Sequence, residues 1–387
     1  MEKLITNDIC LKIIKQCDAN HIDILNNNIT IEKVHLKKFS DEQKGFMGEH
    51  FNLEILTNYG TTYTFFIKSK PILLPSFESY INDIGIFAKE TKLFQTLLET
   101  LRKLSTNAWC PKSYYIYEND AIIMENLVRK GYQVMNHREY FTYQQFSAFI
   151  KTVAAFHSTT IIYEELTRKN SNYKNFRLID KYRNLLEECG YPCDETHIRN
   201  KVLISNAKAF VSNLKYLDNY KEGFDEQILK QLIHLPNRMK INRYRKVMNH
   251  GDLWCNNIMF SCNEDENLKC LLVDFQFARY ACPSQDLMLA MYTTTNREFR
   301  TKYYDHFLEM YYNALGDELK TYSLNINELY PKNDFLQSCS EKRIVGILLA
   351  ALYTVMVFYR SEDIDYNDEH LRERFSEIYQ DILEYVL

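Results

Sequence analysis

Residues 250–274 constrain the fold of this chain more than any other stretch. They begin HGDLWCNNIMF, continue through a polar loop and end LLVDF. Asp252 lies in a short turn, Asn257 follows it closely, and Asp274 comes directly after an apolar run at residues 270–273 that is typical of a buried strand. The fold must therefore hold two carboxylates and one amide at fixed spacing beside a core strand.

These residue types suit phosphoryl transfer. Mg²⁺ is a hard cation, so one carboxylate, one amide oxygen and phosphate oxygens form a sufficient site for it. The pattern H-x-D-x-x-x-x-N followed by D-F is similar to that of protein kinases, where the first Asp accepts the hydroxyl proton and the Asn and second Asp hold magnesium. We therefore expect Asp252 to be the catalytic base and Asn257 and Asp274 to bind magnesium. His250 is expected to hold the loop through hydrogen bonds rather than to act as an acid or base.

The composition is that of a globular chain with no nucleic-acid character. The chain has 387 residues, a net charge of -4 and 46% hydrophobic residues, which is enough for two lobes. No long basic or acidic run is present, so we expect no nucleic-acid partner. The aromatic content of 14% has two explanations, an apolar pocket or an AT-rich coding sequence, and the sequence leaves both open.

The cysteines and the apolar segments indicate in which cellular compartment the protein is expected to lie. Cys189 and Cys193 resemble half a metal site, but no second pair follows, so free thiols of a reducing compartment are favoured. The N-terminal stretch lacks the apolar core of a signal peptide, which predicts a cytoplasmic protein. Residues 344–359 are strongly apolar but shorter than a usual membrane span, so we expect a buried helix and no membrane partner.

Two strings carry a resemblance to a known family. HGDLWCNNIMF, followed by VDFQFARYACPSQDL at residues 273–287, resembles the ecdysteroid kinase-like family of insect small-molecule kinases. This family is related to choline and aminoglycoside kinases and shares the protein-kinase fold. The resemblance is close through the catalytic region and weaker over most of the chain.

The N-terminal part predicts one helix and then an antiparallel sheet. An amphipathic helix within residues 1–28 precedes a strand at residues 29–38, and two further β segments meet in a turn at residues 58–60. Lys68 ends the second of these segments, and Lys70 lies on the same side, so periodicity does not separate them. The resemblance favours Lys68 as the lysine that contacts the nucleotide phosphates, and a solvated surface lysine is the alternative.

The expected phosphate-covering loop, KGFMGEH, has few glycines. It offers Gly45 and Gly48 but no G-x-G-x-x-G, so an ordinary β-turn is nearly as good an interpretation. Its position before the other motifs favours a phosphate contact, made by Gly48 and by the backbone N–H groups of Glu49, His50 and Phe51.

The resemblance also implies an ion-pair partner and a hinge. Within a helix predicted at residues 84–104, the string FAKE matches the family's F-x-K-E and places Glu90 as the partner of Lys68, with an exposed helical Glu as the alternative. After a hairpin at residues 113–127, backbone groups of Glu125, Asn126 and Leu127 are expected to bind the adenine edge.

The remainder is predicted to be mainly helical. His157, near the end of a helix predicted at residues 142–159, is expected to be a core residue rather than a catalytic one. Asp286 resembles the family's Asp that braces the catalytic loop. We therefore predict an α+β bilobal protein-kinase-like fold, with a small antiparallel-sheet lobe at residues 1–127 and a larger helical lobe at residues 128–387.

The expected activity is ATP-dependent phosphorylation of a small molecule with Mg²⁺ as cofactor. The resemblance implies an apolar hydroxylated acceptor, such as an ecdysteroid or a related steroid or xenobiotic. The alternatives are a choline- or aminoglycoside-type kinase, whose acceptor is cationic, and a nucleotide-binding pseudokinase. Lys68, Asp252, Asn257 and Asp274 are all present, which opposes the pseudokinase, and the glycine-poor loop is its only support. The sequence does not indicate the oligomeric state.

Overall fold

The structure is a computed structural model that describes residues 4–18, 28–39, 48–70, 85–170, 173–194, 196–241, 243–261, 268–358 and 368–387. The chain forms two compact units. The first combines Met1–Lys103, Cys110–Gln133 and Ser261–Glu264, and the second combines Leu104–Trp109, Val134–Phe260 and Asp265–Leu387. The first holds an antiparallel sheet and the second is mainly helical, so the predicted α+β fold class is confirmed. The boundary near residue 127 stays a prediction.

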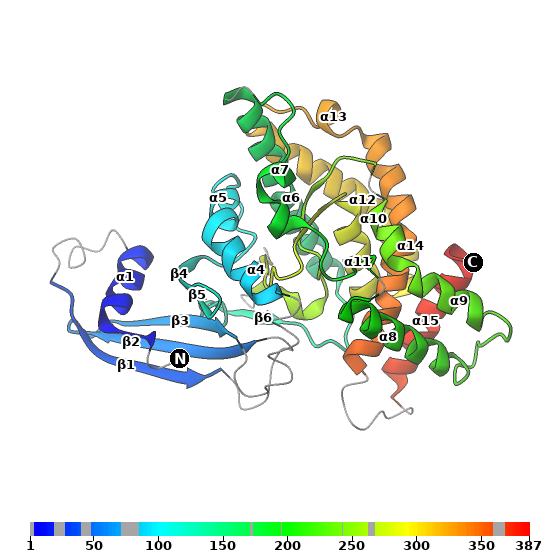
Figure 1. The fold of residues 1–387 in the computed structure, drawn as a ribbon, viewed down its shortest axis with the longest axis horizontal. Helices are drawn as coiled ribbons and strands as arrows, with labels where there is room; N and C mark the ends of the chain where they lie inside the picture. Colours follow the sequence, from blue (N-terminus) through cyan, green and yellow to red (C-terminus); the bar gives the residue numbers. More distant parts are fainter. Residues whose placement is uncertain are drawn as a thin grey trace. The chain divides into compact units, whose positions relative to one another are not determined.

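The sheet of the first unit has five antiparallel strands in the order β1-β2-β3-β5-β4 (Figure 1). In the second half of β2 buried and half-buried residues alternate, which suits a sheet with one covered face, whereas β5 is buried at four successive residues. The bounds are β1 (Ile31–Lys38), β2 (Glu49–Thr57), β3 (Thr62–Ser69), β4 (Ser113–Tyr117) and β5 (Ala121–Glu125). The two β segments predicted to meet at residues 58–60 are therefore present as β2 and β3, and the hairpin predicted at residues 113–127 is present as β4 and β5. Gly45 of the predicted phosphate-covering loop lies outside the described residues.

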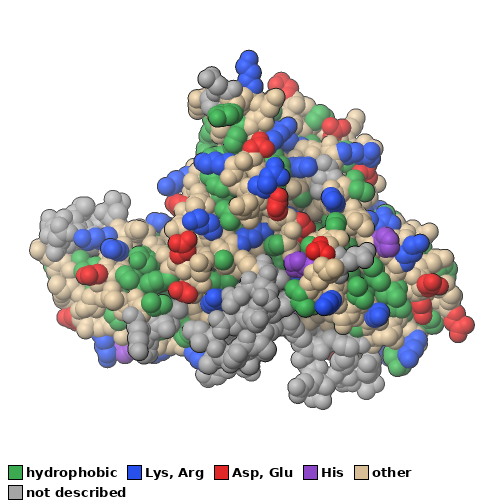
Figure 2. All heavy atoms as spheres, in the orientation of Figure 1, with side chains coloured by type: hydrophobic (Ala, Val, Ile, Leu, Met, Phe, Trp, Pro, Cys, Tyr) green, Lys and Arg blue, Asp and Glu red, His purple; other side chains and the backbone are tan. Residues whose placement is uncertain are grey.

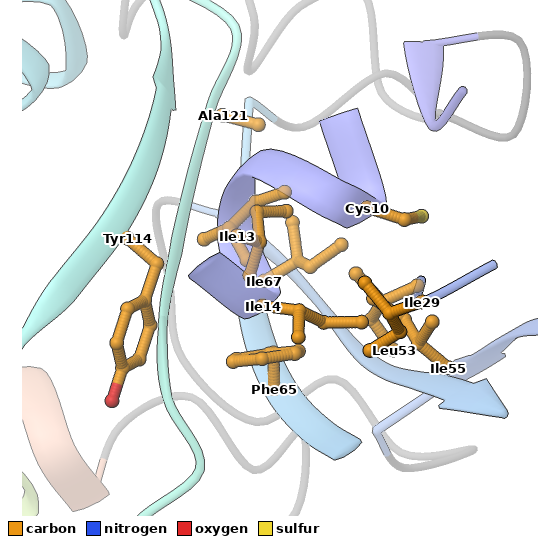
Figure 3. Packing of buried hydrophobic residues seen from close by; sticks show 11 residues of the cluster. Cys10, Ile13, Ile14, Ile29, Leu53, Ile55, Phe65, Ile67, Tyr114 and Ala121 are labelled. Carbon is orange, nitrogen blue, oxygen red and sulfur yellow. The ribbon is translucent and has the colours of Figure 1, made fainter. Parts of the chain in front are cut away.

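Helix α1 (Asn7–Cys17) covers one face of this sheet. Figure 3 shows its Ile13 and Ile14 against Phe65 and Ile67 of β3, and all of these side chains are fully or almost fully buried. The odd-numbered residues of β3 point to this core, and the period of two directs Lys68 to the opposite face.

The helix predicted at residues 84–104 is interrupted by a π-helical turn. It consists of α4 (Ile86–Leu93), the π turn η2 (Phe94–Leu98) and α5 (Glu99–Arg102), and residue 84 lies outside the described part. Buried side chains such as Leu93, Leu97 and Leu101 continue through the π turn. A periodicity argument does not detect such a turn, because one extra residue shifts the apolar face only slightly. After β5 follow the short η3 (Val128–Lys130) and β6 (Tyr132–Val134).

Ten helices are described in the second unit. Their bounds are α6 (Tyr143–Asn170), α7 (Leu178–Leu186), α8 (Ile198–Leu214), α9 (Asp225–Ile233), α10 (Leu235–Lys240), α11 (Ser284–Thr294), α12 (Arg297–Lys320), α13 (Ile326–Leu329), α14 (Lys332–Phe358) and α15 (Glu369–Tyr385). Helix α6 extends eleven residues beyond the predicted end at residue 159, and Ile161, Ile162 and Glu164 of this extension are buried.

The predicted catalytic stretch folds into short strands. Strand β7 (Val247–Asn249) pairs with β10 (Arg279–Ala281), and β8 (Ile258–Ser261) forms a hairpin with β9 (Cys270–Leu272). The strand predicted at residues 270–273 is thus present. In its register Ile258 opposes Leu272, so the residues just before β8 and just after β9 meet at one end of the hairpin.

The apolar run at residues 344–359 belongs to α14 as far as it is described. Ile347, Leu348 and Leu349 are completely buried, and α14 packs against α11 through Gly346, so the predicted buried helix is confirmed. Among the described residues, no helix has both the length and the apolar character needed to cross a bilayer.

Candidate active site

Lys68 forms a buried ion pair with Glu90 in the first unit. Nζ of Lys68 lies 2.6 Å from Oε2 of Glu90, and the two side chains are only 6% and 1% exposed. Strand β3 directs Lys68 away from the α1 core, and α4 presents Glu90 to it. The pair proposed from sequence is therefore formed, and the alternative of an exposed helical Glu90 is excluded.

The residues around Lys68 distinguish it from Lys70. Lys68 opposes His50 in β2 and Ile122 in β5, whereas Lys70 follows the strand and is half-buried. Gly48 is buried against Lys68, where a Cβ atom would meet Cε and Cγ of Lys68 at 3.5 Å. The end of the predicted phosphate loop thus lies beside Lys68. Oε1 of Glu49 is buried and has no hydrogen-bond partner among the described residues.

The predicted hinge is partly committed to internal hydrogen bonds. The N–H of Glu125 donates to Lys112 O (2.9 Å), and the carbonyl of Leu127 accepts from the N–H groups of Lys130 and Tyr132. The side chain of Asn126 donates to Asn52. The backbone N–H groups of Asn126 and Leu127 both lack a partner in the described part of the chain, so both are open to a ligand.

A sharp turn in the second unit carries Asp252. Gly251 has φ +85, and a Cβ atom on it would lie 2.2 Å from the carbonyl oxygen of Phe277. Only glycine tolerates both this backbone conformation and this approach. Arg279 donates to the Gly251 carbonyl (3.1 Å) and to Glu188 (2.6 Å), which fixes the outer side of the turn.

Asp286 at the start of α11 holds the inner side of the same turn. Its carboxylate accepts from the N–H groups of His250 (2.6 Å) and Gly251 (2.9 Å). His157 of α6 is fully buried, with Nε2 3.2 Å from Asp286 and Nδ1 2.8 Å from the hydroxyl of Tyr311. Both residues are structural supports, as predicted.

His250 closes the turn through its ring. Nδ1 accepts from the N–H of Asp252 (3.3 Å), and Nε2 is 2.9 Å from the carbonyl oxygen of Val273. These bonds assign the proton to Nε2 and join the Asp252 turn to the residue before Asp274. His250 thus organises the loop, as predicted.

Both carboxylate oxygens of Asp252 are engaged. Asn257 donates through Nδ2 to Oδ2 (2.8 Å) and to the backbone carbonyl (2.8 Å) of Asp252, and Tyr353 of α14 donates its hydroxyl to Oδ1. Burial raises the pKa of Asp252 to about 6, with a further contribution from the charge of Asp274. The carboxylate is thus fixed in position and is a stronger base than an exposed aspartate.

Asn257 and Asp274 lie at one end of the β8–β9 hairpin. The N–H of Val273 donates to the carbonyl of Asn257 (3.0 Å), and Asp274 adopts φ +70 directly after β9. Nδ2 of Asn257 donates to Asp252, so Oδ1 of Asn257 remains available as a metal ligand. Asp274 adds a carboxylate. These hard oxygen ligands fit Mg²⁺. In the described residues no group of three or more His, Cys, Asp or Glu side chains is placed to hold a metal, so a bound ion needs phosphate or water oxygens as well.

Sequence reasoning missed the side chains that surround Asp252. Tyr353 packs edge-to-face on Trp254 with 6.1 Å between ring centroids. Burial raises the pKa of Tyr191 to about 12, and the charge of Asp252 also raises it whereas the charge of Arg199 lowers it. Arg199 also lies over the ring of Phe277. Tyr353 is 101 residues from Asp252 in sequence, inside an apolar run, so no local pattern identifies it.

The sequence profile of the Ecdysteroid kinase-like family matches residues 46–324, which is most of the chain. The chain belongs to the ecdysteroid kinase-like family. As a member it is a small-molecule kinase, a phosphotransferase with an alcohol group as acceptor. The match includes Lys68, Glu90 and the whole catalytic turn. No curated protein sequence matches this ecdysteroid kinase-like chain.

Several solved structures are similar to this chain at low sequence identity. Plasmodium vivax ethanolamine kinase is 12% identical, with a TM-score of 0.43 over 96% of this chain and 87% of its own. The GDP and kanamycin complex of the aminoglycoside phosphotransferase APH(2")-IIIa is 12% identical, with a TM-score of 0.45 over 96% and 97%. A microcompartment-associated aminopropanol kinase is 12% identical, with a TM-score of 0.41 over 95% and 94%.

Proposed function

We propose that this protein transfers the γ-phosphoryl group of ATP to a hydroxyl of an apolar acceptor, an ecdysteroid or a related hydroxylated steroid or xenobiotic. The observation that carries the proposal is the carboxylate of Asp252, which Asn257 and Tyr353 hold from two sides. A base fixed in this way, beside two oxygen ligands suited to magnesium, is what in-line phosphoryl transfer requires.

In the proposed reaction Asp252 accepts the proton of the acceptor hydroxyl as the hydroxyl oxygen attacks the γ-phosphorus. An alcohol is far less acidic than the Asp252 carboxyl, so the proton is transferred late, once the bond to phosphorus has begun to form. Asn257 and Asp274 would hold the cofactor through their oxygens. Bound Mg²⁺ supplies neutralisation of charge on the phosphate oxygens.

For the nucleotide we propose the residues of the first unit that the sequence singled out. Lys68, held by Glu90 at 2.6 Å, contacts the α- and β-phosphates. Gly48, with the backbone of Glu49 and His50, covers the phosphates, and the N–H of Leu127 binds the adenine edge. Glu125 and Asn126 shape the hinge through their own hydrogen bonds. We propose that the protein works in the cytoplasm.

The surroundings of Asp252 favour an apolar acceptor over a cationic one. Trp254, Tyr353 and Tyr191 give the base aromatic neighbours, which suit a ring system such as a steroid. Arg199 is close enough to Asp252 to lower its pKa against the effect of burial. A fixed cation beside the base opposes choline and aminoglycosides, which are themselves cationic.

Mass spectrometry of reactions with Mg-ATP tests this proposal. The panel contains ecdysteroids, other hydroxylated steroids, plant phenolics, choline and kanamycin, each incubated with wild type and with Asp252→Asn. We expect a gain of one phosphoryl group on a neutral hydroxylated compound with wild type only. Asp252→Asn keeps the size of the side chain, so loss of product reports the base and not the packing.

Two outcomes would contradict the proposal. Product on choline or kanamycin and on no neutral compound would assign the cationic acceptor class instead. Binding of Mg-ATP without product on any compound would favour a pseudokinase, and isothermal titration with Mg-ATP separates this case from an inactive preparation.

A further inference from the structure

One pocket in the helical unit is lined by residues other than those around Asp252. Its volume is about 660 Å³. It lies where α7, the segment before β7, β10 and the α13–α14 connection meet. The lining consists of Arg177, Ile179, Arg183, Arg243, Tyr244, Arg245, Lys246, Tyr280, Leu329, Tyr330, Pro331 and Asp334. None of these residues contributes to the proposed reaction.

The lining is strongly cationic. Five of its side chains are Arg or Lys and one is Asp. Figure 2 shows Lys and Arg side chains gathered over the part of the surface where Figure 1 draws α7. For a chain with a net charge of -4, this concentration of positive charge at one pocket is not a property of the whole surface.

The carboxylates that pair with these cations lie outside the lining. Glu164 of α6 is completely buried and accepts from Arg245 (2.8 Å) and from the hydroxyl of Tyr280 (2.6 Å). Arg177 is 3.5 Å from the same carboxylate, which also contacts Arg168. One buried Glu164, with Glu165 beside it, therefore serves three guanidinium groups, and Arg243 pairs separately with Glu341.

Arg245 is the most constrained of the cations. Its side chain is only 8% exposed, and its Nε is buried without a hydrogen-bond partner among the described residues. Burial lowers the pKa of Arg245, and Arg177 and Arg168 lower it further against the opposing effect of Glu164. A buried guanidinium with an unused donor and cationic neighbours is stabilised by an added anion.

Two further cations are open to a ligand. Lys246 is half-buried and has no hydrogen-bond or ion-pair partner among the residues that the structure describes. Arg183 is 63% exposed, and its interaction with Glu187 is a surface pair at 3.6 Å. Such a pair contributes little, so Arg183 can turn to a ligand at small cost.

The rest of the lining is apolar or aromatic. Tyr244, Tyr280 and Tyr330 contribute rings, and Ile179, Leu329 and Pro331 contribute aliphatic surface. A free inorganic anion would contact only the cationic side chains and would leave the apolar side chains exposed to water. A molecule with an anionic group at one end and an apolar body at the other would use both.

We propose that this pocket is a binding site for organic phosphate or sulfate monoesters, with Arg183, Arg245 and Lys246 on the anionic group and the tyrosines on the apolar body. The site is separate from the residues around Asp252, and the inference does not depend on the proposed function. A phosphate ester is expected to bind more tightly than the matching sulfate ester, because it carries more negative charge near neutral pH.

Isothermal titration of the full chain at low ionic strength tests the proposal. The probes are 1-naphthyl phosphate, 1-naphthyl sulfate, inorganic phosphate and 1-naphthol. We expect both esters to bind. Inorganic phosphate lacks the apolar body and 1-naphthol lacks the anionic group, so each is expected to bind at least about tenfold more weakly. Arg183→Glu and Lys246→Ala are expected to weaken the esters about tenfold.

Two control variants test whether the esters bind in this pocket. Lys302→Ala removes an exposed lysine on α12 and is expected to change nothing. Asp274→Asn alters the predicted metal site and is also expected to leave ester binding unchanged, which separates this pocket from the kinase site. Arg183→Ala replaces Arg183→Glu if the charge reversal impairs folding, as judged by thermal melting.

Three results would overturn the proposal. They are the absence of ester binding to wild type, wild-type affinity in both Arg183→Ala and Lys246→Ala, and equal weakening by Lys302→Ala. The last would indicate nonspecific attraction to surface charge.

Discussion

At the residue scale, Asp252 owes its properties to side chains from three segments. Asn257 comes from the same loop, Tyr353 from α14, and Asp274 raises its pKa from the end of β9. The hydrogen bonds from Asn257 and Tyr353 leave the carboxylate little freedom to rotate. A base held in this way loses little entropy when the acceptor binds.

Tyr353→Phe is expected to lower kcat about tenfold while the KM for ATP stays unchanged. A hydrogen bond to a charged group contributes about 1.5–3 kcal/mol, and Tyr353 contacts the base and not the proposed nucleotide residues. Steady-state kinetics with the acceptor found by mass spectrometry measures both constants. The exposed Tyr173→Phe is the control. An unchanged kcat in Tyr353→Phe would remove Tyr353 from the positioning of the base.

Lys68→Met is expected to destabilise the protein by about 3 kcal/mol, because it leaves the carboxylate of Glu90 buried without this cation. The double variant Lys68→Met/Glu90→Leu is expected to regain most of that stability and to remain inactive. Urea unfolding measures the stability. Lys92→Ala, which breaks an exposed pair with Glu118 at 3.7 Å, should cost less than about 1 kcal/mol. Equal stability of Lys68→Met and wild type would show that the pair is not structural.

At the scale of elements, the catalytic turn depends on contacts between segments that are distant in sequence. Gly251 lies against the backbone of Phe277, Asp286 of α11 accepts two of its N–H groups, and His157 of α6 supports Asp286. The loop itself has little regular structure. Its geometry is therefore set by β10, α11 and α6 and not by local propensity.

Asp286 makes a pH-dependent contribution to this arrangement. Burial raises its pKa, but the hydrogen bond from His157 and the positive charge of Arg279 outweigh burial and lower the pKa below its ordinary value. A lowered folded-state pKa stabilises the protein above about pH 4, and the contribution is lost as the pH falls below that value.

Asp286→Asn should therefore be less stable than wild type at pH 7, by about 2 kcal/mol, and the difference should shrink as the pH falls below about 4. Urea unfolding at a series of pH values measures both. Asp317→Asn, on the exposed side of α12, is the control. A stability difference that stays constant down to pH 3 would contradict the assignment.

The contact between α11 and α14 has little space at Gly346. A Cβ atom there would lie 2.6 Å from the carbonyl oxygen of Met288 and 2.7 Å from its Cβ. Gly346→Ala is expected to cost about 1–3 kcal/mol, because one helix must move away from the other. Gly316→Ala in α12 meets only Ile326 at 3.3 Å and is expected to cost less. Thermal melting of both variants decides, and a larger loss in Gly316→Ala would be inconsistent with this packing.

At the scale of the whole molecule, the two units carry different parts of the proposed reaction. The first unit holds Lys68, Glu90 and the hinge, and the second holds Asp252, Asn257 and Asp274. A nucleotide bound with its metal stabilises the folded chain by mass action, whichever unit provides each contact.

Mg-ATP at about 100 times its dissociation constant is expected to stabilise the folded state by about 2.7 kcal/mol and to raise the melting temperature of the full chain. Removal of the metal with EDTA should abolish most of the rise, because Asn257 and Asp274 need a cation between them and the phosphates. Asp274→Asn should show a smaller rise than wild type. A dye-based thermal-shift assay measures the melting temperature of wild type with Mg-ATP, of wild type with EDTA and of Asp274→Asn. The same rise with and without EDTA would exclude the predicted metal ligands.

The sequence by itself determined the α+β fold class, the presence of an antiparallel sheet and the mainly helical remainder. It also determined the spacing of Asp252, Asn257 and Asp274. These features follow from periods of two and 3.6 residues and from short motifs, which are local properties of the chain. Structural roles for His157 and His250 were also predicted from their positions in the sequence, and the family resemblance predicted the supporting role of Asp286.

Only the tertiary structure decided that Tyr353 bonds to Asp252, that Glu125 and Leu127 use part of the hinge internally, and that Glu164 gathers three arginines behind a cationic pocket. Each of these contacts joins segments that no periodicity relates. The physical reason is that packing of helices and strands selects which distant side chains meet, and the free energy of that packing is a property of the whole core.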